Sequence, residues 1–131
     1  MDAYFAAFPS DFECLGVAFA KAYYTRLQTN RNSVADLYHD MALMTYEGTK
    51  IQGKQAIAKH FQGLTWSTIV VDISTCDSQP VDNGYLVFVN GQLKVDNGDQ
   101  ALPFSEIFLL KKVGDCVLIL HSMFRLNFHN F

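Results

Sequence analysis

Glu47 is the residue whose position most clearly suggests binding chemistry. Two short apolar runs flank Glu47-Gly48, and Gly at the second position suits a tight hairpin with a positive φ angle. A carboxylate at a hairpin tip is ordinary, because turns are solvated. Here Leu43, Met44, Tyr46 and Ile51 are close in the sequence, so we expect Glu47 on the rim of an apolar hollow. A charge in that place would pair with a cation on a partner.

Several polar side chains could equip the same hollow for catalysis, namely Tyr23, Asp40, Glu47 itself and His121. A general base needs a positioned partner and a shifted pKa, which the sequence alone does not show.

Histidine and cysteine spacing gives no sign of a metal site or a cofactor. His39, His60, His121 and His129 lack metal-ligand spacing, so we expect no metal and no cofactor. The three cysteines, Cys14, Cys76 and Cys116, are widely spaced and form no C-x-x-C pair. We therefore expect reduced, buried thiols in an intracellular protein.

Composition bounds the class of protein. A chain of 131 residues, 50% of them apolar, predicts a single domain over 1–131, with an extension of uncertain order at 1–10. The net charge is −3 and the ten Lys and Arg residues form no stripe, which argues against nucleic-acid binding. The N-terminus has no basic region or long apolar core, so no signal peptide is expected. No apolar run approaches a membrane span.

Three helices are expected before residue 66. Ser10 and Glu13 fit a capping box that opens a helix ending near 28–32. Ser33 begins a second capping box and a short helix through Tyr38. Gly53 starts a third helix, which carries apolar residues on one face and is closed by the glycine at position 63.

The second half of the chain predicts antiparallel strands. Alternation at 69–73 is followed by a turn at 80–84, a long strand over 85–95, and strands over 104–112 and 116–128. The segment 96–99 predicts a turn with Asn97-Gly98 at its centre. Helices followed by strands indicate an α+β fold, with a curved sheet wrapped around the helices.

Two late strands are apolar at consecutive positions, over 107–110 and 117–120. Both faces of the sheet must then be covered, and the helices can cover only one. The other face would be a large exposed apolar patch, which usually marks an interface. A symmetric homodimer that packs sheet on sheet is the economical prediction.

Four segments resemble the nuclear transport factor 2 family, and the likeness runs from about Phe12 to Phe131. They are Glu47-Gly48 with Gln52-Gly53-Lys54, Gly91-Gln92-Leu93-Lys94-Val95-Asp96, Phe108-Leu109-Leu110-Lys111, and Met123-Phe124-Arg125-Leu126 with His129-Asn130-Phe131. The resemblance implies a cone-shaped α+β homodimer without enzymatic activity. It implies a carrier that takes the GTPase Ran, in its GDP form, into the nucleus and meets Phe-rich repeat nucleoporins. Its expected locations are the cytoplasm, the nuclear envelope and the nucleus.

The resemblance also implies roles for single residues. An aromatic side chain of Ran would enter the hollow lined by Tyr46, Leu93, Leu102 and Ile107. Glu47 takes the place of the rim glutamate and Asp96 that of the first loop aspartate. Asp99 would act as the second, by a different path, because the loop is one residue longer here. Tyr46 stands in place of a Trp of the family. Phe12, also in place of a Trp, and Met123 would contact nucleoporin repeats.

Simpler interpretations stay open beside these. Turn chemistry alone explains Glu47, Asp96 and Asp99, while Phe12 and Met123 are ordinary core residues by default. The same fold also serves enzymes that resemble ketosteroid isomerase or dehydratases. Against catalysis, the positions that the resemblance places in the cavity are almost wholly apolar, namely Tyr46, Leu93, Leu102 and Ile107. A third hypothesis is a dimeric scaffold module that does not bind Ran.

Overall fold

The structure is a computed structural model that describes residues 11–127. Ser10, Phe128 and residues 129–131, which carry parts of the predictions above, lie outside the described range. The elements, in chain order, are α2 (Phe12–Thr29), the 3₁₀ helix η1 (Arg31–Leu37), β1 (Tyr38–Tyr46), β2 (Thr49–Gln52), α3 (Lys54–Gln62), β3 (Ile69–Val81), β4 (Gly84–Val95), β5 (Leu102–Val113) and β6 (Cys116–Leu126).

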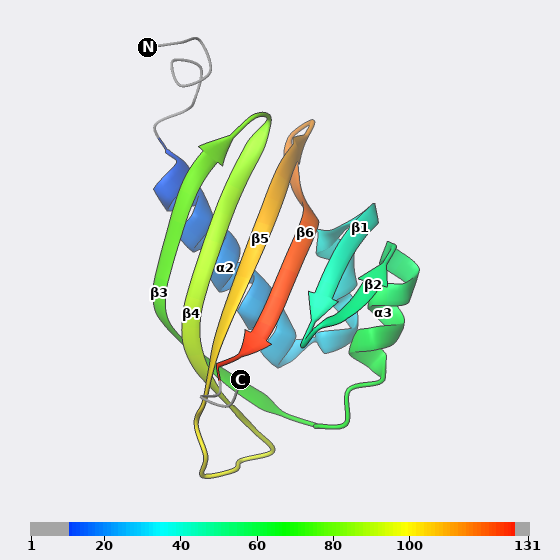
Figure 1. Ribbon diagram of the computed structural model, residues 1–131, viewed down its shortest axis with the longest axis vertical. Helices are drawn as coiled ribbons and strands as arrows, with labels where there is room; N and C mark the ends of the chain where they lie inside the picture. Colours follow the sequence, from blue (N-terminus) through cyan, green and yellow to red (C-terminus); the bar gives the residue numbers. More distant parts are fainter. Residues whose placement is uncertain (1–10, 128–131) are drawn as a thin grey trace.

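One curved sheet organises the chain, with strand order β2-β1-β6-β5-β4-β3. Only β1 and β6 pair in parallel, and the other neighbours are antiparallel. Figure 1 shows α2 crossing behind β3 to β6, while α3 lies beside β1 and β2. The predicted α+β fold, with helices against one face of a strongly curved, mostly antiparallel sheet, is confirmed.

The hairpin and the helix after it also form as predicted. Glu47 (φ 50°) and Gly48 (φ 85°) make the two-residue turn between β1 and β2. Two positive φ angles match the right-handed twist of the flanking strands, and Gly takes such an angle without steric cost. Gly53 then precedes α3, and Gly63 ends it with its N–H bonded to Lys59 and His60 carbonyls.

Two turns and one helix start differ from the prediction. The turn after β4 is centred on Asp96 (φ 52°) and Asn97 (φ 57°), and the Gly98 N–H closes it on the Val95 carbonyl at 2.9 Å. The turn is therefore centred one residue earlier than predicted. Asp and Asn tolerate left-handed backbone angles better than most residues, so they can occupy the two central positions of this turn.

The strand β3, which precedes the β3–β4 turn, is longer than predicted, because it continues through Pro80. Since β3 is an edge strand, the N–H that proline lacks need not cost a ladder hydrogen bond. The turn shrinks to the two residues between Val81 and Gly84. The second helix begins at Arg31 rather than Ser33, and the Ser33 hydroxyl donates to the Asn30 carbonyl at 2.8 Å instead of capping.

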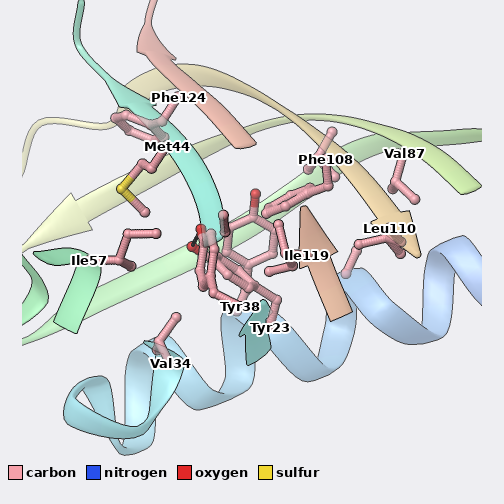
Figure 2. Packing of buried hydrophobic residues seen from close by; sticks show 14 of the residues in the cluster. Tyr23, Val34, Tyr38, Met44, Ile57, Val87, Phe108, Leu110, Ile119 and Phe124 are labelled. Atoms are coloured by element: carbon pink, nitrogen blue, oxygen red, sulfur yellow. Dashed lines mark hydrogen bonds between the residues drawn. The ribbon is translucent and has the colours of Figure 1, made fainter. Parts of the chain in front are cut away.

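Aromatic and branched residues fill the space between α2 and the sheet. Phe108 of β5 is fully buried beside Tyr23 (Figure 2), and the two rings lie 4.8 Å apart. The ring of Phe19 lies 4.9 Å from that of Phe108. Val87, Leu110 and Ile119 pack in the same cluster. These contacts hold α2 across the concave face of the sheet.

The cysteines depart from expectation in one respect. All three are free, but Cys14 and Cys116 are exposed, so the prediction that they are buried is wrong. Cys14 lies on the outer side of α2, and Cys116 begins β6 directly after a turn. Within residues 11–127, no helix combines the length and the apolar character that crossing a membrane requires.

Candidate functional site

A cavity of about 180 Å³ lies on the concave side of the sheet, near the C-terminal end of α2. Aliphatic side chains complete its wall, including the predicted Leu93 and Leu102. Its aromatic lining comes from every layer of the fold: Tyr23, Tyr24, Tyr46, Phe61, Trp66, Phe104 and Phe124. A cavity of about 150 Å³ with apolar walls can hold a benzene molecule, so this one has room for one aromatic ring.

The rings hold one another in place along one wall. The Tyr46 and Phe124 rings stack with centroids 4.9 Å apart, and Phe104 follows at 5.6 Å from Phe124. The next contact joins Phe104 to Tyr24 of α2, at 5.7 Å. This chain of contacts connects β1, β6, β5 and α2, so the cavity wall is a packed surface rather than a set of independent side chains.

Ile107 is the predicted cavity residue that the structure places elsewhere. Side chains along a strand alternate between the two faces, and Phe104 and Phe108 of β5 point inward. Ile107 therefore faces the convex side, where it lines a second hollow with Leu109 and Met123. The prediction that Ile107 lines the aromatic cavity is wrong.

Glu47 lies beside two lining residues of the cavity. It follows Tyr46 directly, and its carboxylate oxygen Oε1 accepts a hydrogen bond of 2.5 Å from the backbone N–H of Leu126. Its own N–H donates to the Phe124 carbonyl at 3.0 Å. The side chain is exposed. Two hydrogen bonds to β6 thus hold Glu47 next to the cavity wall, directly after the end of β1.

Asp96 lies next to lining residues from two other segments. It follows Val95, and its Oδ1 accepts hydrogen bonds from the N–H groups of Ser67 (2.7 Å) and Thr68 (3.0 Å), directly after Trp66. The carboxylate therefore fastens the β4–β5 turn to the start of β3. Asp99 is exposed further along the same loop. Figure 1 shows this loop and the β1–β2 turn at the same end of the sheet.

The wall also contains a carboxyl group that sequence reasoning missed. Glu106 of β5 is 4% exposed, and the Tyr24 hydroxyl donates to its Oε1 at 2.7 Å. Close by, the hydroxyls of Tyr23 and Tyr38 are hydrogen-bonded at 3.1 Å, and that of Tyr38 is hydrogen-bonded to the Ser122 hydroxyl at 2.9 Å. The cavity is therefore less apolar than its predicted lining.

Burial controls the ionisation of this group. It raises the pKa of Glu106 to about 8, against a smaller lowering by the hydrogen bond from Tyr24. The pKa values of Tyr23 and Tyr24 are also raised, chiefly by burial and then by the nearby Glu106. At neutral pH Glu106 is thus mainly in its neutral, protonated form.

The signal that would have found Glu106 was present in the strand pattern. Phe104, Glu106, Phe108 and Leu110 share the parity of the inward face of β5. Alternation therefore predicts that Glu106 points inward and Ile107 outward. The alternation is hidden because residues 107–110 are all apolar, so this part of the strand has no polar side that marks its orientation.

The two residues expected to bind nucleoporins are not neighbours within one chain. Phe12 is half-buried at the start of α2, which covers the concave face of the sheet, and it packs against the core. Met123 is 52% exposed and lines the convex hollow. The sheet separates the two side chains, so one chain alone does not form a groove from both.

The residues considered for catalysis are likewise dispersed. Of the four, Tyr23 lines the cavity, whereas Asp40, Glu47 and His121 are not part of its wall. His121 lines the convex hollow instead. Over residues 11–127, no group of three or more His, Cys, Asp or Glu side chains is arranged to hold a metal ion.

The buried carboxyl predicts how stability depends on pH. The folded-state pKa of Glu106, about 8, exceeds the unfolded value of 4.5, so the folded state holds its proton longer. The free energy of unfolding should then fall between those pH values by up to about 1.4 kcal/mol per pH unit. In Glu106→Gln this decline should be absent, so the variant gains stability relative to the original chain as pH rises.

Urea denaturation at several pH values would measure this difference. The new amide adds an offset that does not depend on pH, so the slope, not the absolute stability, is the relevant quantity. Glu13→Gln, at an exposed position of α2, is the matched control and should keep the slope of the original chain. Identical slopes for Glu106→Gln and the original chain would show that Glu106 titrates normally.

Known proteins share both the sequence and the fold. The family model described as Nuclear transport factor 2 (NTF2) domain matches residues 15–126. A protein named nuclear transport factor 2 from Oryza sativa subsp. japonica is 36% identical over 120 residues, which cover 90% of this chain and 98% of that protein. The structure of nuclear transport factor 2 from Cryptosporidium parvum superposes with a TM-score of 0.86 at 36% identity, covering 90% of this chain and 96% of that one.

More distant structures share only the fold. One is a putative ketosteroid isomerase from Parabacteroides distasonis, with a TM-score of 0.67 and 13% identity, covering 85% of this chain and 84% of that one. Such a likeness carries no argument about activity. The family model and the rice relative extend over nearly the whole described chain. The chain therefore belongs to the nuclear transport factor 2 family.

Proposed function

We propose that this chain binds Ran in its GDP form and carries it through the nuclear pore, between the cytoplasm, the nuclear envelope and the nucleus. Its family makes it a nuclear transport carrier and not an enzyme. The observation that carries the Ran proposal is an aromatic-lined cavity of about 180 Å³ with Glu47 and Asp96 beside its lining residues.

The cavity and the rim would bind different groups of Ran. An aromatic side chain of Ran fits the volume and would bury its ring against Tyr46, Leu93 and Leu102. Glu47 and Asp96 would pair with cations of the same segment of Ran, with Asp99 further along the loop. Because charges at a rim act mainly on specificity, these carboxylates would select the conformation of Ran that presents those cations.

Glu47→Lys should abolish detectable binding of Ran-GDP, because it replaces attraction by repulsion at the rim. Glu47→Gln is the matched control, since its amide oxygen can still accept the Leu126 N–H. Truncating one partner of a buried ion pair costs about 2–5 kcal/mol, and an exposed pair costs less. We expect an intermediate loss for Glu47→Gln. Calorimetry against Ran-GDP and Ran-GTP measures both variants.

Two results would contradict the Ran proposal. One is equal binding of the GDP and GTP forms by the original chain. The other is unchanged Ran-GDP binding by Glu47→Lys, which would favour the dimeric scaffold hypothesis. Circular dichroism of both variants would exclude a folding defect as the cause of any loss.

We also propose a homodimer that packs through the convex face of the sheet. The hollow on that face is lined by Leu86, Ile107, Leu109 and Met123, and nearby Phe88 is 42% exposed. A second copy would cover this apolar surface. Phe12 and Met123, which the sheet separates within one chain, would then contribute to nucleoporin binding only at surfaces completed by the dimer.

Ile107→Asp should give a monomer in light scattering, because a buried unpaired carboxylate at the interface is costly. Gln92→Asp provides the control, since Gln92 is an exposed polar residue of β4 outside the hollow. We expect that variant to remain dimeric. A monomeric original chain at high concentration would refute the dimer.

Phe12→Ala should weaken binding to immobilised Phe-rich repeats and leave Ran-GDP binding unchanged. The half-buried ring of Phe12 offers apolar area at the start of α2, worth about 25 cal/mol per Å² that a repeat covers. Leu15→Ala, one turn further along the same helix at a 36% exposed position, is the control. Equal loss of both partners in Phe12→Ala would identify Phe12 as a core residue.

A further inference from the structure

The carboxyl group of Glu106 has no cationic partner among the described residues that influences its ionisation. Burial and the Tyr24 hydroxyl account for its state. Its neighbours across the sheet, Val89 of β4 and Phe124 of β6, are buried and apolar. Buried carboxyl groups are normally paired with a cation, so one without such a partner in a cavity wall is a candidate site for a ligand.

The other groups of the wall favour a ligand of positive charge. Tyr46, Phe104 and Phe124 form a continuous aromatic surface, and the faces of such rings attract cations. One ring already holds a cation: the Arg31 guanidinium carbon lies 4.6 Å from the ring centroid of Trp66. Anions are disfavoured, because they would meet the ring faces and a carboxyl group together.

We propose that the cavity binds a small organic cation, a primary ammonium attached to a compact aromatic or aliphatic group. The ammonium would be paired with Glu106, and the apolar part would pack against the aromatic wall. The volume of about 180 Å³ limits the ligand to the size of a single ring with a short substituent. Binding transfers the carboxyl proton to solvent, and the ion pair replaces the neutral acid.

This site is the same cavity in which we place an aromatic side chain of Ran. An ammonium ligand would therefore compete with Ran-GDP, and that part of the inference rests on the proposed function. Direct binding of the cation does not, because it needs only the isolated chain. Glu106 is not one of the rim residues proposed to bind Ran. A substitution at Glu106 therefore tests the ammonium site separately from the rim carboxylates Glu47 and Asp96.

The groups that face Glu106 allow a pH test. Tyr23 and Tyr24 on α2 and Tyr46 on β1 have raised pKa values, so they stay neutral at pH 8 and below. The pKa of Tyr38 is raised as well. His60 of α3, which contacts Tyr46, has a lowered pKa through burial. Val89 and Phe124 do not titrate. Glu106 is thus the group among these that changes charge near pH 8.

The test uses benzylamine, which stays cationic over this range, and benzyl alcohol, a neutral molecule of nearly the same shape. Calorimetry or NMR titration would measure their binding to the original chain, to Glu106→Gln and to the rim control Glu47→Gln. We expect saturable benzylamine binding that Glu106→Gln weakens at least tenfold and Glu47→Gln leaves nearly unchanged. Between about pH 6 and 7.5 the affinity of the original chain should rise up to about tenfold per pH unit, as release of one proton requires.

Several outcomes would overturn the inference. They are no benzylamine binding, tighter binding of benzyl alcohol, an unaffected Glu106→Gln, or an affinity that does not change with pH. The pH series needs no variant, so the inference stays testable even if a substitution disturbs folding. A chain that binds Ran-GDP but not benzylamine keeps the proposed function and loses this inference. Benzylamine binding without competition against Ran-GDP would instead count against the cavity as the Ran site.

Discussion

The packing of α2 against β5 is the contact on which the site depends. Phe108 of β5 is enclosed by Phe19, Tyr23 and Tyr24 of the helix, with ring centroids at 4.9, 4.8 and 6.4 Å. This contact fixes the helix at one level of the sheet. Toward the N-terminus of β5, Glu106 and Phe104 then face a space that the helix does not fill, and this space is the cavity. Removing the Phe108 ring would loosen the helix that supplies two tyrosines to the cavity wall.

The same packing makes Glu106 a costly residue to retain. Its carboxyl is enclosed by rings and aliphatic groups, and residues 11–127 supply one hydroxyl donor but no cation that shifts its pKa. A glutamine would satisfy the Tyr24 hydroxyl without the burden of a titratable group. Residues that destabilise a fold locally are common at binding sites, where a ligand compensates for them. A cavity built only to hold an aromatic ring has no need of a carboxyl group.

Local features could be predicted from the sequence, and those that depend on distant contacts could not. The Glu47-Gly48 hairpin and the Gly53 and Gly63 ends of α3 follow from residue types within a few positions. The centre of the β4–β5 turn was misplaced by one residue, because Asp-Asn and Asn-Gly both tolerate left-handed angles. A long-range factor, the bond of Asp96 to the N–H groups of Ser67 and Thr68, favours the observed placement.

The candidate site shows the same limit. Tyr24 and Glu106 are 82 residues apart in the chain, so no local pattern predicts their hydrogen bond. The face on which Ile107 lies was predictable from alternation, but consecutive apolar residues concealed it. In the same way, Phe12 and Met123 are both expected to contact nucleoporin repeats, and only the arrangement of α2 and the sheet shows that they lie on opposite sides of the sheet.

The two rim carboxylates share a geometry that affects the entropy of recognition. Glu47 and Asp96 both have left-handed backbone angles, and each has one oxygen bonded to backbone N–H groups of another segment. Flexible acidic side chains lose rotamer freedom when a partner's cation fixes them. The side chains of Glu47 and Asp96 lose part of their rotamer freedom on folding, so association with a partner would order them little further. The rim is thus preorganised: the entropic cost of ordering these two side chains arises largely on folding, and little of it arises again at each association.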